Sequence, residues 1–485
     1  MECNTAKDNC TEDLKDLFFN TFNQRVEQIN RLDASGSNRK YYRMQAGTIT
    51  VIGAYNEDWK ENRAFIAFSR HFLQKGIAVP VIYAENLEKN CYLQSDLGNE
   101  TLYAYLCRLR NSSQSFPEAI IPIYKQVLND LLEIQLAGKE DFDYSLCYPR
   151  DAFDKQSIAW DLNYFKYYFL KLAAIPFDED LLEKDFKTLT QFLLEADNRF
   201  FLYRDFQSRN IMLKENKLYY IDYQGGRKGA LQYDVAALLY DAKAAIPQTV
   251  REELLNHYWE QLQKQLPEQA ASFLKYYHGF VLIRIMQAMG SYGFRGFYER
   301  KPHFLQSIPY ALKNLEYLLS HTQLPIEIPH LWHVLSQLTQ SETLRQYAKK
   351  TLTVTLNSFS FKNGYPVDSN GNGGGFVFDC RCLPNPGRDN RYAALTGKDA
   401  AVIAYLEKEN TVIQYLEHIK QIIDLAIKNY IERGFENLSI SFGCTGGRHR
   451  SVYCAEKMQK YINQNYTVNT QLSHLMENYW GKGVN

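Results

Sequence analysis

The chain has 485 residues, enough for about three domain-sized units, and its 55 Lys and Arg balance 55 Asp and Glu, for a formal net charge of zero. This balance argues against general attraction to nucleic acid or to a membrane surface, so any charged site must be local. Nine cysteines without paired CxxC motifs, and the lack of a signal-like N-terminus or a long apolar run, predict a soluble cytoplasmic protein without zinc or a disulfide framework.

The N-terminal part of the chain predicts a small sheet with flanking helices. Apolar residues at helical spacing indicate helices over residues 14–29 and 61–74. Strands are expected at residues 40–44, 48–55, 80–83 and 92–97. Between the first helix and the first of these strands, small polar residues let backbone N–H groups approach phosphate, although on this stretch alone an ordinary hairpin loop is the better interpretation. The candidate nucleotide-binding residues in this loop are Ser35, Gly36, Ser37 and Arg39.

The strand expected at residues 48–55 lacks a residue that many kinases use. Kinases of the protein-kinase type place a Lys here, where it pairs with the nucleotide phosphates. Residues 48–55 contain none. We therefore expect Arg39, Lys40 or Arg43 to substitute for it, or Mg²⁺ and the backbone to take over its role.

A hinge and a helical lobe follow. Residues 95–98 should form the hinge between two lobes, with backbone groups of Ser95, Asp96 and Leu97 facing an adenine ring. Helical periodicity then predicts a lobe beneath the cleft. Its helices are placed at residues 102–109, 120–136, 158–172, 181–197, 234–245, 252–266, 273–289, 304–320 and 331–338.

Two features of these helices suggest an acceptor site. Trp160, Asp161, Tyr164 and Tyr168 fall on one helical stripe, which fits either core packing with one solvated carboxylate or an aromatic and acidic sugar site. Arg284 lies in an apolar stretch, where it is either a structural ion-pair partner or a substrate clamp.

The residues most informative about chemistry are Asp205, Asn210 and Asp222. Phosphoryl transfer needs a carboxylate to orient the acceptor hydroxyl and oxygen ligands for Mg²⁺, and this spacing predicts Asp205 as the base with Asn210 and Asp222 as metal ligands. An Asp and an Asn in an ordinary turn are the alternative. Tyr203 stands where such motifs usually have His. Asp234 is expected to cap a helix, with support of the catalytic loop as an additional role.

A second unit is expected after a boundary near residue 345. Strands at residues 351–361, 376–379 and 438–442 and helices at 399–406, 412–432 and 452–461 imply an α/β layer, with a glycine-rich loop at 369–375.

The last of these strands leads into a predicted anion site. A strand end, glycines, a helix N-terminus and two arginines converge there, and a structural turn with solvated arginines is the alternative. Cys444, Arg450 and Ser451 also reproduce the spacing of cysteine-dependent phosphatases, so catalysis by the thiol is a further alternative. The residues of this site are Gly443, Cys444, Thr445, Gly446, Gly447, Arg448, His449, Arg450 and Ser451.

Residues 10–340 resemble the aminoglycoside phosphotransferase and choline kinase superfamily in the runs RDF, IDYQ and YDVAALLYDA and in Asn210. They are more similar to bacterial anomeric kinases of N-acetylmuramate and N-acetylglucosamine, in residues 33–35, 96–98 and 160–165. This resemblance implies an α+β bilobal protein-kinase-like fold, ATP and Mg²⁺ as cofactors, and a small-molecule sugar substrate of cell-wall recycling. Its match at residues 160–165 includes the candidate acceptor residues Trp160 and Asp161.

Residues 352–466 resemble the C-terminal domain of the RNase adapter protein RapZ, in the runs FDCRCLPNPGR, LTGKDAAVIAYLE and GCTGGRHRSVYCAE. The resemblance implies small-RNA binding and glucosamine-6-phosphate sensing. Residues 351–485 contain 14 Lys and Arg and 12 Asp and Glu, a net charge of only +2, whereas RNA binding usually shows a basic stripe. A sugar-phosphate or nucleotide effector is therefore favoured over RNA.

Together these patterns predict a kinase-like domain over residues 1–345 and a smaller α/β phosphate-binding domain over residues 346–485. The leading hypothesis for function is an ATP-dependent sugar kinase with no membrane partner. The alternatives are an RNA-binding adapter with a kinase-like scaffold and a kinase for an aminoglycoside or choline-type acceptor.

Overall fold

The computed structural model describes residues 9–32, 39–110, 116–139, 141–347, 352–367, 375–432 and 435–480. Its chain forms two compact units. Unit 1 comprises Met1–Phe294 and Ser307–Arg345, and unit 2 comprises Arg295–Gln306 and Gln346–Asn485. The segment Arg295–Gln306, with η5 (Phe294–Tyr298) at its start and α10 (Pro302–Leu305), groups with the second unit.

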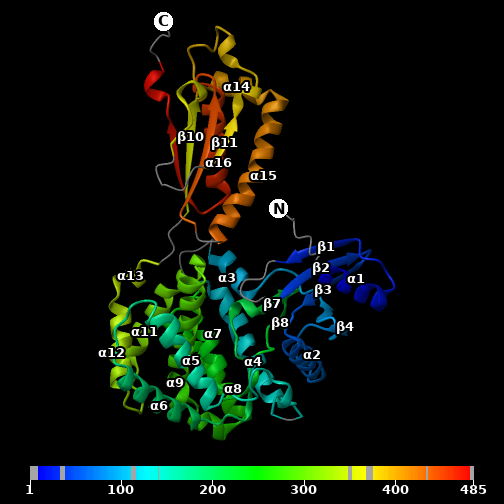
Figure 1. Ribbon diagram of the computed structural model, residues 1–485, viewed down its shortest axis with the longest axis vertical. Coiled ribbons are helices and arrows are strands. Elements are labelled where there is room, and N and C mark those ends of the chain that lie inside the picture. The colour runs from blue at the N-terminus through cyan, green and yellow to red at the C-terminus, as the bar shows by residue number, and fades with distance from the viewer. Residues whose placement is uncertain are drawn as a thin grey trace, which may run out of the picture. The chain divides into compact units, whose positions relative to one another are not determined.

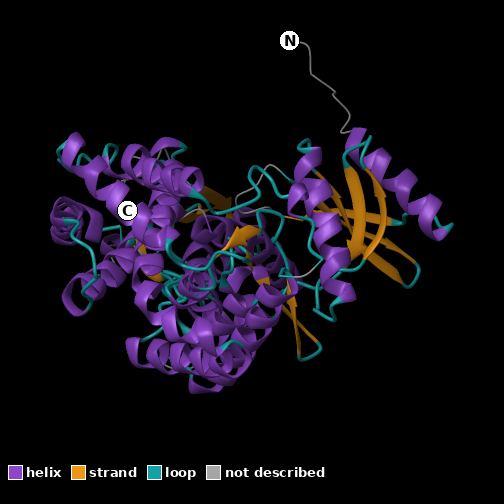
Figure 2. Cartoon of the chain, turned by 90° about the horizontal axis from the view of Figure 1, so that it is seen from below, coloured by secondary structure: helices purple, strands orange, loops and turns teal. Residues whose placement is uncertain are grey.

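Unit 1 begins with an antiparallel sheet of order β1-β2-β3-β5-β4 between two helices (Figures 1 and 2). Alternate residues of β5 point to opposite faces. Leu93 packs in the cluster that contains Leu14 of α1, whereas Tyr92 lies 5.5 Å from the ring of Phe65 in α2. The two helices therefore cover opposite faces. The bounds are α1 (Asn9–Phe22), β1 (Gln28–Leu32), β2 (Lys40–Ala46), β3 (Ile49–Tyr55), α2 (Trp59–Gln74), β4 (Ile82–Asn86) and β5 (Cys91–Ser95).

The helix predicted over residues 14–29 is wrong at its C-terminal end. Asn23 adopts a left-handed conformation with φ 53°, which ends α1 at Phe22. Residues Gln28–Leu32 instead form β1, which pairs antiparallel with β2. Val26 and Ile29 continue the helical spacing in the sequence, but Val26 lies in the loop before β1, and Ile29 pairs with Met44 of β2.

The larger part of unit 1 is helical and is built around α9. This helix packs against α5, α6, α7, α8 and α11. Gly290 and Gly293 permit close approach of α5 and the π-helical turn η3, because an added Cβ would lie 2.7 Å from Cδ1 of Tyr164 and 1.9 Å from the backbone oxygen of Tyr168, respectively. The bounds are α3 (Leu102–Arg110), α4 (Ile121–Ala137), α5 (Lys155–Phe165), η3 (Lys166–Leu170), α6 (Glu179–Leu194), α7 (Gln232–Leu239), α8 (Gln248–Gln265), α9 (Pro267–Gly293), α11 (Ile308–His321), α12 (Pro329–Gln340) and α13 (Glu342–Arg345).

Two short strand pairs carry the loops between these layers. β6 (Phe200–Leu202) pairs with β9 (Arg227–Gly229), and β7 (Ile211–Lys214) pairs with β8 (Lys217–Tyr220), all antiparallel. The loop between β6 and β7 and the loop after β8 are consequently held side by side.

Unit 2 contains a four-stranded parallel sheet of order β11-β12-β10-β13. Its edge strand β13 was not predicted, because its sequence NTQLSH lacks an apolar alternation and its backbone pairing with β10 determines the structure. The bounds are β10 (Thr353–Ser360), β11 (Phe376–Asp379), α14 (Ala400–Glu407), α15 (Asn410–Glu432), β12 (Asn437–Cys444), α16 (Arg450–Asn465) and β13 (Asn469–His474).

The expectations about disulfides and about membrane-spanning segments can be compared with the described residues. Their cysteines are all free, and within the same ranges we find no helix with the length and apolarity needed to cross a bilayer.

Candidate active site

The structure brings Asp205, Asn210 and Asp222 together between the two strand pairs. Nδ2 of Asn210 donates to the backbone oxygen of Asp205 at 2.9 Å and to Oδ2 of Asp222 at 3.2 Å. Gln224, which sequence reasoning did not single out, donates from Nε2 to Oδ1 of Asp222 at 2.7 Å. These bonds leave Oδ1 of Asn210 as the amide atom that can face a cation.

The charge state of Asp222 fits a cation site. Burial, with the Asp205 carboxylate nearby, raises the pKa of Asp222 to about 6. Within the described ranges no three His, Cys, Asp or Glu side chains are grouped to hold a metal by themselves. Mg²⁺ usually takes only one or two protein carboxylates and completes its shell with phosphates and water. The donor set of Asn210 and Asp222 is therefore suited to Mg²⁺ bound together with a nucleotide.

Asp234 supports the loop between β6 and β7, which is the predicted catalytic loop, and does not cap a helix. It lies inside α7, whose N-cap residue is Leu231. Its carboxylate accepts the backbone N–H groups of Tyr203 at 2.7 Å and Arg204 at 3.0 Å. Burial raises the pKa of Asp234 to about 7. The expected capping role is thus wrong, because both carboxylate oxygens of Asp234 accept from peptide groups of this loop and α7 has no side-chain cap.

The predicted acceptor residues have different environments. Asp161 is buried and forms an ion pair with Arg204, so it is not a solvated carboxylate. Trp160 is 45% exposed, with the guanidinium of Arg150 5.7 Å from its ring. Arg284 is buried, and its Nη2 lies 4.0 Å from Oδ1 of the half-exposed Asp205.

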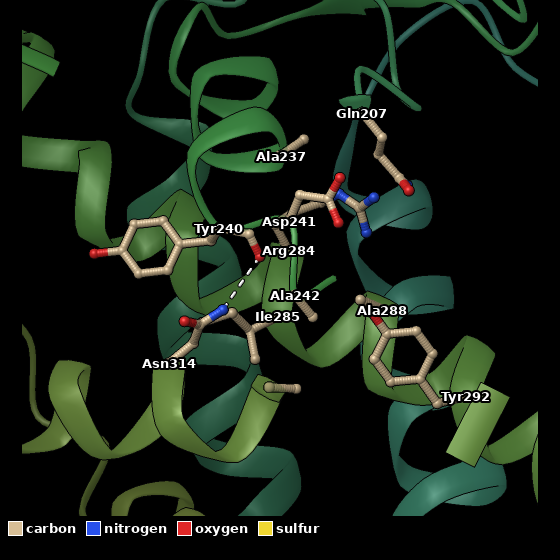
Figure 3. Close-up of a pocket in the computed structure, with 11 residues that line it drawn as sticks. Gln207, Ala237, Tyr240, Asp241, Ala242, Arg284, Ile285, Ala288, Tyr292 and Asn314 are labelled. Carbon is tan, nitrogen blue, oxygen red and sulfur yellow. Dashed lines mark hydrogen bonds between the residues drawn. The ribbon is translucent and has the colours of Figure 1, made fainter. Parts of the chain in front are cut away.

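A small cavity lies beside the catalytic loop (Figure 3). Figure 3 shows the guanidinium of Arg284, the carboxylate of Asp241 and the amide of Gln207 gathered on one side of it. Asp241 also accepts the Ser208 hydroxyl at 2.7 Å, which ties the end of α7 to the loop. Sequence reasoning missed Asp241, although it lies in the run YDVAALLYDA.

On the expected nucleotide side, the three cations named above have different partners. Arg39 is buried and donates from Nη2 to Glu61 of α2 at 2.9 Å and from Nη1 to the Tyr41 hydroxyl at 3.1 Å. Lys40 instead lies over the ring of Tyr55 at 5.8 Å. An Arg–Glu pair thus joins the sheet to α2, as a Lys–Glu pair does in protein kinases. Ser35, Gly36 and Ser37 lie outside the described residues.

Arg43 and the hinge residues are engaged with one another. Arg43 makes a bidentate contact with Asp96 at 2.6 and 2.9 Å. The backbone oxygen of Asp96 accepts from Lys214 at 2.9 Å, and the backbone N–H of Ser95 donates to Val81 at 2.9 Å. These contacts fix the path of the hinge into Leu97.

Helix α2 also reaches the segment that follows Asp222. The ring of Phe65 stacks on Tyr223 at 4.9 Å, and the hydroxyls of Ser69 and Tyr223 lie 2.5 Å apart.

The loop of residues 443–451 in unit 2 has its arginines turned to backbone carbonyls. Arg450 donates to the oxygens of Arg381 at 3.0 Å and Leu383 at 2.9 Å, and Arg448 donates to Ala394. Arg450 is buried and is therefore not the solvated side chain of the alternative interpretation, whereas Arg448 is partly exposed. Nε2 of His449 lies 3.0 Å from the backbone oxygen of Tyr392.

The rest of this loop is closely packed except at its tip. Sγ of Cys444 is buried and lies 3.1 Å from Oγ of Ser451. Gly443 lies against Phe359 and Phe361, and Gly447 has φ 62° and packs on Met476. Thr445 and Gly446 are exposed. The exposed backbone of this loop is therefore at Thr445 and Gly446, because Arg450 and Ser451 at the start of α16 are buried.

Comparison with known proteins gives two matches along the chain. The model of the phosphotransferase enzyme family matches residues 28–273, and the model of the RapZ C-terminal domain matches residues 352–476. A nucleotide-binding protein of Acidobacterium capsulatum is 36% identical over 132 residues, which cover 27% of this chain and 41% of the relative. The chain thus spans about two fifths of the length of such curated relatives.

Solved structures with similar folds are distant in sequence. A thermostable mutant of an aminoglycoside phosphotransferase in its apo form is 13% identical with a TM-score of 0.41, covering 67% of this chain and 98% of that one. An ethanolamine kinase of Plasmodium vivax is 11% identical with a TM-score of 0.42, covering 66% of this chain and 84% of that one.

Proposed function

The chain belongs to the phosphotransferase enzyme family, and we propose that its first unit transfers the γ-phosphoryl group of ATP to the anomeric hydroxyl of N-acetylmuramate or N-acetylglucosamine. The observation that carries this proposal is the grouping of Asp205, Asn210 and Asp222 by hydrogen bonds of 2.9 and 3.2 Å. These are the groups that phosphoryl transfer requires in kinases of this fold.

Each residue has a separate role in the proposed reaction. The Asp205 carboxylate orients the acceptor hydroxyl and accepts its proton as the bond to phosphorus forms. Oδ1 of Asn210 and the Asp222 carboxylate would hold Mg²⁺, which when bound neutralises charge on the phosphates. Arg39, paired with Glu61, would take the place of the usual nucleotide-phosphate lysine.

The acceptor is proposed as a neutral or anionic sugar. The resemblance of residues 160–165 to anomeric kinases supports this choice, and the exposed Trp160 offers an aromatic face of the kind that sugars stack on. The cationic Arg284 near Asp205 disfavours polycationic aminoglycosides and choline, because like charges repel in a partly desolvated site. Its guanidinium suits the carboxylate of N-acetylmuramate.

The proposal is tested by ATP consumption against a panel of free amino sugars, aminoglycosides and choline, with the product read by phosphorus NMR. An anomeric phosphate is expected from N-acetylmuramate or N-acetylglucosamine, and a methyl glycoside of the same sugar should remain unmodified. Phosphorylation of the methyl glycoside would refute the anomeric assignment. Turnover of an aminoglycoside or choline alone would replace the sugar by that acceptor.

For unit 2 we propose binding of a sugar phosphate or a nucleotide at the loop of residues 443–451. The exposed tip at Thr445 and Gly446 before α16 supports an anion held by backbone N–H groups. Calorimetry of the full chain with glucosamine-6-phosphate and ADP, beside a gel shift with structured RNA, tests it. Selective RNA binding without small-anion binding to this loop would favour the adapter hypothesis instead.

A further inference from the structure

The residue immediately before the proposed base has an unusual backbone conformation. Arg204 has φ 84°, in the left-handed region that side chains with a Cβ rarely adopt. Such a conformation persists only when the surrounding structure holds it. What holds Arg204 therefore also determines where the next residue, Asp205, points.

The side chain of Arg204 is held from α5 and α7. Its Nη1 donates to Oδ2 of Asp161 at 2.7 Å and to the Tyr233 hydroxyl at 2.7 Å, and its Nη2 donates to Oδ1 of Asp161. The rings of Phe153 and Tyr233 each lie 5.3 Å from the guanidinium. This bidentate and aromatic enclosure fixes the orientation of the guanidinium plane as well as its place.

The backbone of the same residue is held by a different carboxylate. Asp234 of α7 accepts the N–H of Arg204 at 3.0 Å. Asp161 and Asp234 therefore constrain the two ends of one residue, its guanidinium and its peptide nitrogen. With both in place, the left-handed backbone and the direction of the Asp205 side chain are determined together.

We infer that Asp161 is a positioning residue that fixes the proposed base Asp205 through Arg204, and not a group that contacts the sugar. This inference rests on the proposed function and deepens it. The side chain of Asp161 is only 8% exposed and that of Arg204 is 15% exposed, so the pair is enclosed by protein. Trp160, the neighbouring residue, remains available to an acceptor because it faces solvent.

The first test replaces Asp161 by Asn, which keeps the shape but loses the bidentate charge contact. The matched control is Asp185→Asn, because Asp185 is also buried and its carboxylate accepts the N–H of Leu331 at 2.8 Å, a contact with α12 and not with the catalytic loop. With MgATP and either N-acetylmuramate or N-acetylglucosamine, Asp161→Asn should lower kcat about 100-fold with KM for the sugar nearly unchanged. Asp185→Asn should leave kcat unchanged. A raised sugar KM with an unchanged kcat in Asp161→Asn would overturn the inference, since that is the signature of a lost substrate contact.

A readout independent of turnover separates this inference from the proposed function. Hydrogen exchange of the amides of residues 203–210 should become faster in Asp161→Asn and stay at the wild-type rate in Asp185→Asn. If wild-type protein turns over neither sugar, the proposed acceptor fails while the exchange result still decides the role of Asp161. Equal exchange of the loop in both variants and the wild type would refute it.

A double variant distinguishes positioning from mutual charge neutralisation. Arg204→Met or Asp161→Leu alone leaves one buried charge unpaired and should lower Tm, whereas the double variant removes both charges and should regain most of that loss. Under the inference, kcat of the double variant stays about 100-fold low. Recovery of kcat together with Tm would overturn it, because the pair would then serve stability alone.

Discussion

The amide nitrogen of Asn210 lies 3.2 Å from Oδ2 of Asp222, so the two predicted magnesium ligands are held as a pair by the fold itself. The same nitrogen contacts the backbone of Asp205 at 2.9 Å. The Asn210 side chain thereby links the proposed base to the proposed metal site. Substitution of each of these residues is expected to have a different effect.

Asp205→Asn is expected to lower kcat by about 1000-fold, within the usual contribution of a general base. The affinity for ATP should change little, because the carboxylate faces the acceptor. Single-turnover kinetics and ATP calorimetry measure the two quantities. The control is Asp197→Asn in the loop after α6, where the carboxylate accepts from Arg199 and Gln269. Retained turnover would reject the assignment of the base.

Magnesium-nucleotide binding should depend on pH through Asp222. Its pKa of about 6 means that protons compete with the cation, so MgADP affinity should be about fourfold weaker at pH 5.5 than at pH 7.5. Calorimetry at the two pH values measures this difference, and Asp222→Asn should show weak binding at both. A wild-type affinity independent of pH would contradict the role.

The ionised carboxylate of Asp222 should destabilise the folded protein above about pH 6 when no cation is bound. Its folded-state pKa lies above the value of roughly 3.9 in an unfolded chain, so its stabilising contribution is complete below about pH 4 and is lost as the pH rises through about 6. We expect Asp222→Asn to raise Tm at pH 8 by about 2–4 °C and to give a smaller gain at pH 5. Thermal unfolding without Mg²⁺ tests this, and an equal gain at both pH values would count against it.

The Arg39–Glu61 pair should be coupled in nucleotide binding. Arg39→Met and Glu61→Gln are each expected to weaken MgADP binding, with a coupling energy of about 1–2 kcal/mol in a double-mutant cycle. Arg70 and Glu85 give a matched control, because their ion pair of 3.1 Å also involves α2 but is exposed and should show no coupling. Additive effects of Arg39→Met and Glu61→Gln would show that the two residues do not act as a pair in nucleotide binding.

Two neighbouring glycines should respond differently to the same change. Gly447→Ala should destabilise unit 2 by about 2 kcal/mol or more, because φ is 62° and the new Cβ would lie 2.5 Å from Met476. Gly446→Ala should have little effect on folding, since no atom lies within 4 Å of the added Cβ. Denaturant unfolding measures both, and equal stability of the two variants would show that the turn relaxes.

Sequence reasoning was informative where the functional residues are close along the chain. Asp205 and Asn210 belong to one loop, and Asp222 follows after a short hairpin, so their spacing alone indicates a common site. The phosphotransferase fold and the RapZ-like C-terminal part were recognised from similarly local runs, and the family matches confirm both.

Contacts between distant residues were not predictable in the same way. The partner of Asp161 is 43 residues away and that of Asp234 is 30 and 31 residues away, and no periodicity encodes which carboxylate meets which loop. Asp161 therefore looked solvated and Asp234 looked like a helix cap. The arginines of the loop in unit 2 similarly looked free for an anion, because their carbonyl partners come from the segment after β11.

Helix α2 carries Glu61, Phe65 and Ser69 at intervals of four residues, so the partners of Arg39 and Tyr223 lie on a single helical face. A compound that displaced this helix would disturb both Arg39, the proposed nucleotide-phosphate residue, and Tyr223, which follows the proposed magnesium ligand Asp222. A screen for inhibitors that do not compete with the sugar could therefore start from this helix, with a spin label on its outer surface as the sensor of displacement.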